Sequence, residues 1–382
     1  MPQAPSTGSQ DPENGEFLLN LRAALPQSGG ALRGLPAIDW GAQHIDPALV
    51  PMPVDLATAD WPDSAPLPAA DMVVMTWTIA EWAALDHVFC DHQKEMTVAD
   101  AKSKTWRAPW AFYRRNYSSI LEDLEKAKKA HWGVPSLDDK AWGSFRMVTL
   151  GDKKVLLIKS AMHLAQDGPT LPLTQFVDQV CQEVRPHLLL SIGTAGAVRF
   201  EDALGAALVS NQALFMLEKA FKDEPFNKTT VKSPWVPKGT FVPQAQALCI
   251  PVPGYPVYPV SPQYPQETIE PLVPDSRIKL VVERPIITTD TFLFGTTTNE
   301  LWTKGCIVEM DDAVVGLRAQ MSDVPFGFVR NASDPVMNGM LPPEVQRAWA
   351  TYIYQERGLF TSFNGALATW AMLAGFVAGK GP

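Results

Sequence analysis

Compact apolar runs alternate with segments of helical spacing along most of the chain, and this alternation limits the fold more than any other feature. The apolar runs suit buried strands and include "DMVVMTW", "HLLLSIGTAGA", "GCIVEM" and "PFGFVRNAS". The intervening segments carry apolar residues at helical intervals, as in "IAEWAALDHVF", "TLPLTQFVDQVCQEV" and "DDAVVGLRAQMS". Buried strands that alternate with helices predict an α/β fold whose central sheet is covered by helices on both faces.

Other segments extend this pattern. "FRMVTL" and "KVLLIKS" flank a Gly-Asp turn and predict two strands, and "GAALVSNQALF" predicts one more. In "HLLLSIGTAGA" we expect the strand to end in a glycine-rich turn. Two helices are expected after the last strand. The apolar stretch "ALATWAMLAGFVAG" is too short to span a bilayer and predicts a buried helix.

Composition shifts divide the chain into regions. Residues 1–70 are rich in Pro, Gly, Ala and Asp and predict an N-terminal extension with a short helix around "GEFLLNLRAAL". Residues 71–382 are expected to form one domain with two insertions. The first, at about 101–145, is basic and predicted to be helical. The second, at about 233–277, has a proline every few residues, which excludes regular helix and central strand.

The overall composition excludes several classes of protein. Hydrophobic residues make up 46% and charged residues 19%, which is typical of a globular protein. The formal net charge of −9 argues against a general nucleic-acid binder, because such proteins need clustered Lys and Arg. The four cysteines are scattered without a CxxC pair, and the N-terminus has no basic region followed by an apolar run. We therefore expect a cytoplasmic protein that associates with neither membrane nor nucleic acid.

A metal site is not predicted. His87, Cys90 and His92 have a loosely metal-like spacing, but positions on one helix explain them better. No cofactor is expected either.

Polar residues gather where four of the predicted strands end, and ligands of α/β folds bind beyond such ends. These positions are Glu81 in "TWTIAEW", Thr194 in "SIGTAGA", Glu309 to Asp312 in "VEMDDA", and Arg330, Asn331, Ser333 and Asp334 in "FVRNASDPV". Each has a plain structural explanation when taken alone. A tight turn explains the glycines, the first turn of a helix explains Glu81, helix capping explains the aspartates after Met310, and a turn explains Asp334.

Taken together and in order, these segments resemble the nucleoside phosphorylase/nucleosidase superfamily, which includes purine nucleoside phosphorylases, methylthioadenosine/S-adenosylhomocysteine nucleosidases and AMP nucleosidases. The site pattern is most similar to that of the methylthioadenosine/S-adenosylhomocysteine nucleosidases. The resemblance covers roughly 71–100, 146–215 and 279–382 and rests on "LLLSIGTAGAV", "PIITTDTFLFG", "IVEMDDAVVG" and "FVRNASDPV". It implies a three-layer α/β/α fold with a mixed twisted sheet, cleavage of an N-glycosidic bond, and a homodimer or larger homo-oligomer.

The resemblance also implies roles for individual residues. Asp334 would protonate N7 of a departing purine, which a buried carboxyl group can do at neutral pH, and Arg330 and Ser333 would position it and nearby water. Met310 would pack against the sugar and Asp311 would hold its diol. Most members of the family have Glu at the position of Asp311. A shorter reach to the diol, a share of this role for Asp312, or a different sugar would each account for this departure.

The remaining predicted contacts follow from the same resemblance. The base would lie near Phe292 and Leu293, although core packing explains Phe292 nearly as well. Met162 and His163 would line the pocket, with a histidine satisfied inside a loop as the alternative for His163. The predicted substrate-binding residues are Thr194, Gly196, Met162, His163, Phe292, Leu293, Glu309, Met310, Asp311 and Ser333.

The attacking group separates hydrolases from phosphorylases in this superfamily. Phosphorylases bind phosphate with arginines, but the position before the glycine turn is Ser191 and "TWTIAEW" has no arginine. Glu81 falls where the hydrolytic members have the glutamate that activates water. With Asp334 as acid and Glu81 as base, the pair parallels inverting glycosidases. This favours hydrolysis of a purine nucleoside or nucleotide.

Three alternatives remain at this point. A phosphorylase would need arginines from the insertions or from a neighbouring subunit, for which Arg107, Arg114 and Arg115 are candidates. The same arginines would bind a substrate phosphate in a nucleotide N-glycosidase. A nucleoside-binding or sensor protein without catalytic activity would use the same fold, because fold does not determine function.

Overall fold

The computed structural model describes residues 33–55, 61–118, 141–162, 171–202, 204–219, 221–252 and 277–379. The strands are β1 Gly34–Leu35, β2 Met52–Pro53, β3 Met72–Thr76, β4 Met96–Thr97, β5 Ala111–Tyr113, β6 Gly143–Leu150, β7 Lys153–Ser160, β8 Leu188–Ala197, β9 Ala207–Ser210, β10 Gln212–Phe215, β11 Thr230–Lys232, β12 Ile278–Leu280, β13 Ile286–Thr288, β14 Ile307–Glu309 and β15 Phe326–Asp334. The helices are α2 Ile79–Phe89, α3 Val98–Ser103, α5 Leu171–Val184, α6 Val242–Leu248, α7 Asp312–Met321 and α8 Pro343–Ala378, with short 3-10 turns at Gly41–Gln43, Pro47–Leu49, Thr105–Arg107 and Leu301–Thr303.

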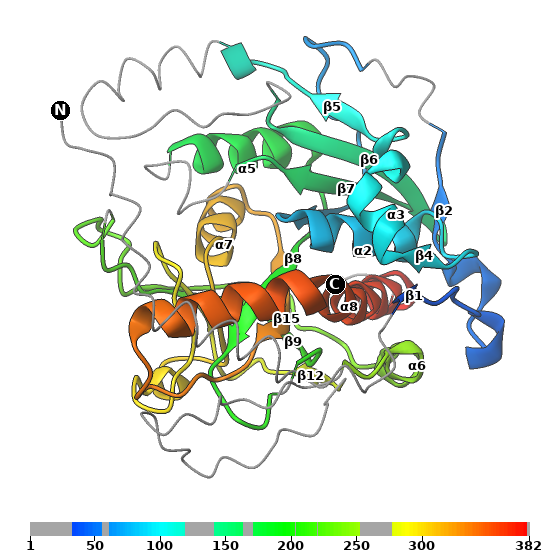
Figure 1. Ribbon diagram of the computed structural model, residues 1–382. Coiled ribbons are helices and arrows are strands. Elements are labelled where there is room, and N and C mark those ends of the chain that lie inside the picture. The colour runs from blue at the N-terminus through cyan, green and yellow to red at the C-terminus, as the bar shows by residue number, and fades with distance from the viewer. Residues whose placement is uncertain are drawn as a thin grey trace.

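A large mixed sheet forms the centre of the protein (Figure 1). Its main path runs β11-β10-β13-β14-β8-β3-β7-β6-β2, and β15, β9, β12 and β5 branch from it. Strand β8 has β3 and β15 as parallel neighbours, whereas β6 pairs with β7 and β14 pairs with β8 in antiparallel fashion. The α/β fold with a mixed central sheet that the sequence predicts is confirmed.

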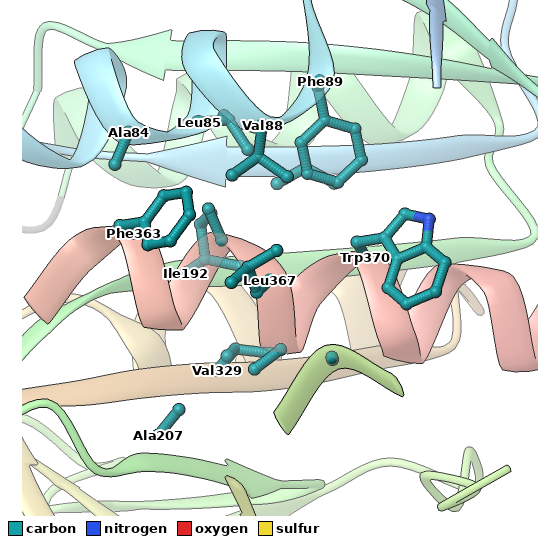
Figure 2. Packing of buried hydrophobic residues seen from close by; sticks show 14 of the residues in the cluster. Ala84, Leu85, Val88, Phe89, Ile192, Ala207, Val329, Phe363, Leu367 and Trp370 are labelled. Atoms are coloured by element: carbon teal, nitrogen blue, oxygen red, sulfur yellow. The ribbon is translucent and has the colours of Figure 1, made fainter. Parts of the chain in front are cut away.

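Alternate side chains of the central strands enter two different hydrophobic clusters. Met72 and Val74 of β3 join residues of α2, α6 and α8 in one cluster, while Val73 and Met75 join residues of α5 and α7 in the other. Because successive side chains of a strand point to opposite faces of the sheet, helices must cover both faces. Figure 2 shows the first cluster, where Val88 of α2 and Leu367 of α8 lie close to the strand residues Ile192 and Val329.

Helix α8 lies along the sheet as one continuous helix of 36 residues, in place of the two helices expected from the sequence (Figure 1). The stretch predicted to be too short for a bilayer is thus part of a longer helix. Within Ala350–Ala378 this helix is long and apolar enough to cross a membrane, yet 89% of its most apolar stretch is buried inside the protein, as in a core helix. Asn331 of β15 donates a hydrogen bond from Nδ2 to the Thr361 hydroxyl at 2.9 Å. Gly365 lets the helix approach this strand, since a Cβ there would lie 2.5 Å from Asn331 Oδ1.

Several segments differ from their predicted form. The described part of the basic region 101–145 holds the end of α3, a 3-10 turn, strand β5, two helical residues at 117–118 and the start of β6. Ala111, Phe112 and Tyr113 pair with β6 instead of continuing a helix. The segment "GAALVSNQALF" forms two strands, β9 and β10, that pair with different neighbours. The predicted helix around "GEFLLNLRAAL" lies outside the described residues.

The proline-rich region also departs from its prediction. Helix α6 lies within its described part and has a proline, Pro243, in its first turn. Proline is tolerated there because that backbone N–H has no partner within the helix. The rule that proline excludes helix therefore fails at the start of a helix.

Candidate functional site

A cavity of about 290 Å³ opens at the ends of β3, β8, β14 and β15. The N-terminal half of α8 and the loop after β13 complete its wall. It is lined by Trp77, Thr78, Glu81, Thr194, Ala195, Gly196, Phe292, Leu293, Val308, Glu309, Met310, Asp311, Arg330, Ser333, Asp334, Thr351 and Tyr354.

One edge of β8 changes partner beside this cavity. The ladder with β3 reaches Ser191, and the ladder with β14 begins at Gly196. Between them, two side chains bind the backbone of Thr194. Its N–H donates to Glu81 Oε1 at 2.8 Å, and its carbonyl accepts from Arg330 Nη1 at 3.4 Å. A carboxylate and a guanidinium therefore occupy the place where a neighbouring strand would satisfy β8.

Glu81 is held by five hydrogen-bond donors. Its Oε1 accepts from the N–H and hydroxyl of Thr194, at 2.8 and 2.7 Å. Its Oε2 accepts from the Thr76 hydroxyl at 3.0 Å and from the N–H groups of Trp77 and Thr78 at 2.9 and 2.8 Å. The last contact completes a capping box that starts α2. Burial acts to raise the pKa of Glu81, but the Arg330 charge and the Thr194 and Thr78 hydrogen bonds outweigh it and lower that pKa.

Arg330 lies in a buried cluster of carboxyl groups. Its Nε and Nη2 donate to the two oxygens of Asp312 at 2.9 and 2.5 Å, and Nη2 also reaches Ser191 Oγ at 3.2 Å and Glu309 Oε2 at 3.0 Å. Burial acts to lower the pKa of Arg330, but the Asp312 and Glu309 carboxylates raise it, so the guanidinium stays charged.

Glu309 accepts hydrogen bonds from backbone N–H groups at the start of α7. Its carboxyl oxygens accept from the N–H groups of Asp311 at 2.6 Å and Asp312 at 3.0 Å, and they contact the Thr288 hydroxyl. Burial and the Asp312 carboxylate raise the pKa of Glu309 to about 8.

Asp334 differs from the other carboxyl groups of the cavity. Its Oδ2 accepts a hydrogen bond from Ser333 Oγ at 3.2 Å, whereas its buried Oδ1 has no hydrogen-bond partner among the described residues. Burial raises the pKa of Asp334 to about 7, with the Ser333 hydrogen bond opposing the shift. This group can carry a proton at neutral pH and release it to a ligand.

Comparison with known proteins gives a family. The model of the phosphorylase superfamily matches residues 120–351, more than half of the chain. The chain belongs to the phosphorylase superfamily.

Solved structures of similar fold cover about four fifths of the chain. A methylthioadenosine/S-adenosylhomocysteine nucleosidase from Helicobacter pylori is 13% identical, with 80% of this chain and 98% of that one aligned and a TM-score of 0.45. Futalosine hydrolase from Helicobacter pylori is 12% identical over 79% and 96%, with a TM-score of 0.44. A methylthioadenosine/S-adenosylhomocysteine nucleosidase from Neisseria meningitidis is 12% identical over 80% and 99%, with a TM-score of 0.43. No match was found among curated proteins.

The structure brings most residues that the superfamily resemblance selected to one cavity. Those in its wall are Glu81, Thr194, Gly196, Phe292, Leu293, Glu309, Met310, Asp311, Arg330, Ser333 and Asp334. Met162 is instead fully buried in the core with α5 and is not part of the wall. His163 lies outside the described residues.

Arg330 has hydrogen-bond partners that the sequence did not indicate. The superfamily resemblance implied that Arg330 positions Asp334 and nearby water, and its described hydrogen bonds go to Asp312, Ser191 and Thr194. The physical reason is the unbalanced charge of Asp312 and Glu309, which would be costly to bury without a cation. Among the described residues, Ser333 donates a hydrogen bond to Asp334.

Sequence reasoning missed other residues of the cavity. Helix α8 contributes Thr351 and Tyr354, and nothing in the pattern of that amphipathic segment marks them. Burial and the Glu81 charge raise the pKa of Tyr354, so its phenol stays neutral beside the carboxylates. Asp312 was noted only as a helix cap or a second sugar contact, and its pairing with Arg330 depends on two segments meeting in space.

The sequence did not single out Gly193 as a site residue. Its close contacts with Arg330 and Glu81 lead to a testable prediction. A Cβ at this position would lie 2.5 Å from Arg330 Nη1 and 3.0 Å from Glu81 Oε1, and both side chains are held by several hydrogen bonds. Gly193→Ala is therefore expected to destabilise the protein by about 1–3 kcal/mol, because it overpacks a buried site. Urea denaturation measures this loss. Gly239→Ala is the control, since its Cβ would meet nothing nearer than Leu280 Cδ1 at 3.4 Å. Equal stability of the two variants would contradict the assigned role.

Proposed function

We propose that this member of the phosphorylase superfamily hydrolyses the N-glycosidic bond of a purine nucleoside. The observation that carries the proposal is the Asp334 carboxyl group, which lines the cavity, has an unpartnered Oδ1 and has its pKa raised to about 7. A departing purine is a poor leaving group unless it is protonated. An acid with a pKa near the working pH is suited to that step.

Glu81 is proposed to receive a proton from the attacking water. Its lowered pKa keeps it charged, and negative charge also favours the positive character that the sugar gains in the transition state. All five of its contacts are donors, so water must displace one of them. The Thr194 hydroxyl can rotate away from Oε1 at 2.7 Å and leave room for a water there.

The remaining wall residues are proposed to hold the nucleoside. Phe292, which is 40% exposed and packs against Phe294 at a centroid distance of 5.7 Å, offers an aromatic face to the base. Leu293, Thr194 and Gly196 complete that side. Met310 and Asp311 would contact the sugar, with Glu309 and Ser333 supporting Asp311 and Asp334.

Phosphorolysis is disfavoured by the charges of the wall. Arg330 is the one cationic side chain among its lining residues, and it is already paired. The arginines considered as alternatives are engaged elsewhere. Arg107 lies over the Trp82 ring at 4.3 Å, Arg114 pairs with Asp63 at 3.3 Å, and Arg115 pairs with Glu183 at 2.9 Å.

A substrate panel with and without inorganic phosphate tests the proposal. Release of free purine and free sugar without phosphate is expected. Strict dependence on phosphate, with a sugar 1-phosphate as product, would identify a phosphorylase. Binding of nucleosides without any turnover would identify a binding protein and overturn the enzymatic proposal.

The pH dependence follows from the raised pKa of Asp334. The acid form is required, so kcat/KM, which reports the ligand-free enzyme, should fall as pH rises through about 7. The native state binds this proton between about pH 4 and 7 while the unfolded chain does not, so its contribution to stability is lost as pH rises, by at most about 1.4 kcal/mol per pH unit. Comparing wild type with Asp334→Asn across this range isolates the effect. Identical pH slopes for the two proteins would contradict the raised pKa.

A further inference from the structure

The cavity is rich in carboxyl groups and poor in free cations. Four acidic side chains line it, namely Glu81, Glu309, Asp311 and Asp334, and Arg330 is the cationic residue of the wall. An unpaired arginine in such a wall would be the natural contact for a phosphate, because its planar fork matches phosphate oxygens.

Asp312 occupies the hydrogen-bond donors of Arg330 that a phosphate would need. The Nε and Nη2 groups of Arg330 form an edge of the guanidinium that can donate two parallel hydrogen bonds, and both donate to Asp312, at 2.9 and 2.5 Å. The second Nη2 proton faces Ser191 Oγ and Glu309 Oε2, and Nη1 donates to the Thr194 carbonyl. The described contacts thus occupy both ends of the fork.

Asp312 is also fixed in place. It is the first residue of α7, its side chain is fully buried, and its N–H donates to the Glu309 carboxyl group at 3.0 Å. A carboxylate held this way cannot swing aside to let an anionic ligand reach Arg330, because leaving the guanidinium would strand a buried charge.

We infer that Asp312 bars oxyanions from the cavity by occupying the Nε–Nη2 edge of Arg330, and that the ligand is therefore a nucleoside that carries no phosphate. Asp312 is a positioning residue in this scheme, since it acts through Arg330. The nucleoside part of the inference rests on the proposed function, whereas the exclusion of oxyanions does not.

Inorganic phosphate is the probe for the exclusion. Calorimetric titration is expected to show no saturable binding to wild type below about 10 mM, and at least about tenfold tighter binding to Asp312→Asn, a difference of about 1.4 kcal/mol. The amide has one acceptor oxygen where the carboxylate has two, so it accepts from only one of Nε and Nη2 and frees one prong of the fork. The matched control is Asp178→Asn, which breaks a similar bidentate pair with Arg318 that lies outside the cavity wall. Millimolar binding by wild type, or a folded Asp312→Asn that binds no better, would overturn the inference.

A second arm uses wild type alone and so does not depend on the variant folding. Adenosine, inosine and guanosine are compared with their 5′-monophosphates by thermal shift and by turnover. At least about tenfold weaker binding of the monophosphates is expected. If nucleosides and their 5′-monophosphates bound and reacted equally well, the exclusion of oxyanions by Asp312 would be disproved. The proposed N-glycosidase activity would not be affected by that result. Absence of turnover, with phosphate still excluded until Asp312 is changed, would overturn the proposed function and leave the role of Asp312 intact.

Discussion

Asp334→Asn is expected to lower kcat for a purine nucleoside by about 10²–10⁴-fold, the usual range for loss of a general acid. The variant keeps the shape of the side chain but cannot give a proton to the base. Because Oδ1 has no described partner and Oδ2 accepts only from Ser333, the substitution disturbs few contacts. Circular dichroism and urea denaturation should show an intact fold.

The choice of leaving group makes this prediction specific. A riboside of p-nitrophenol releases a stable anion that needs no protonation, so its hydrolysis should be nearly unaffected by Asp334→Asn. Ser333→Ala, which removes the one described hydrogen bond to Asp334, serves as a neighbouring control and should reduce kcat far less. If both substrates lost activity equally, Asp334 would have a structural role or a role in binding and would not be the acid.

Arg330→Met is expected to destabilise the protein by about 3–5 kcal/mol, since it leaves buried carboxylates without their cation. The affected groups are Asp312, which is wholly buried, and Glu309, whose pKa is already raised. A loss of this size is a large share of the free energy of unfolding of a typical protein, which is about 5–15 kcal/mol. The midpoint of urea denaturation measures it.

Two comparisons separate lost charge from lost packing. Arg318→Met breaks the Arg318–Asp178 pair, whose side chains are 25% and 22% exposed, and should cost only about 1 kcal/mol or less. The double variant Arg330→Met/Asp312→Leu removes both charges and should recover much of the stability lost by Arg330→Met alone. An Arg330→Met variant as mild as Arg318→Met would show that the buried cluster is not held by this cation.

The order of elements was readable from the sequence because buried strands and helices have distinct periods. The strand around Val73 and the helix around Val88 both appear where expected. Strand ends were also informative, since the polar residues that follow Thr76 and Val329 meet in one cavity. The local sequence pattern does not predict the structure where pairing between strands determines it. Gly193 looked like part of a turn, but its pairing with Arg330 of β15 holds it in β8.

The contacts inside the cavity were less accessible to sequence reasoning. Asp312 and Arg330 are separated along the chain, and each had a plain local explanation. Their pairing depends on how α7 and β15 cross, which periodicity does not encode. Tyr354 enters the site because α8 is one long helix that passes the cavity, a length that the amphipathic pattern of its first half did not reveal.

The gap between the β3 and β14 ladders along β8 affects the activation energy of the proposed reaction. Glu81 and Arg330 are oriented by peptide groups of the sheet, which cannot turn as solvent dipoles would when charge develops on a sugar. The energy needed to align these dipoles is therefore met during folding, before any ligand arrives. The same interruption that leaves one edge of β8 without a neighbouring strand supplies a polar environment that is already organised for the transition state of the proposed reaction.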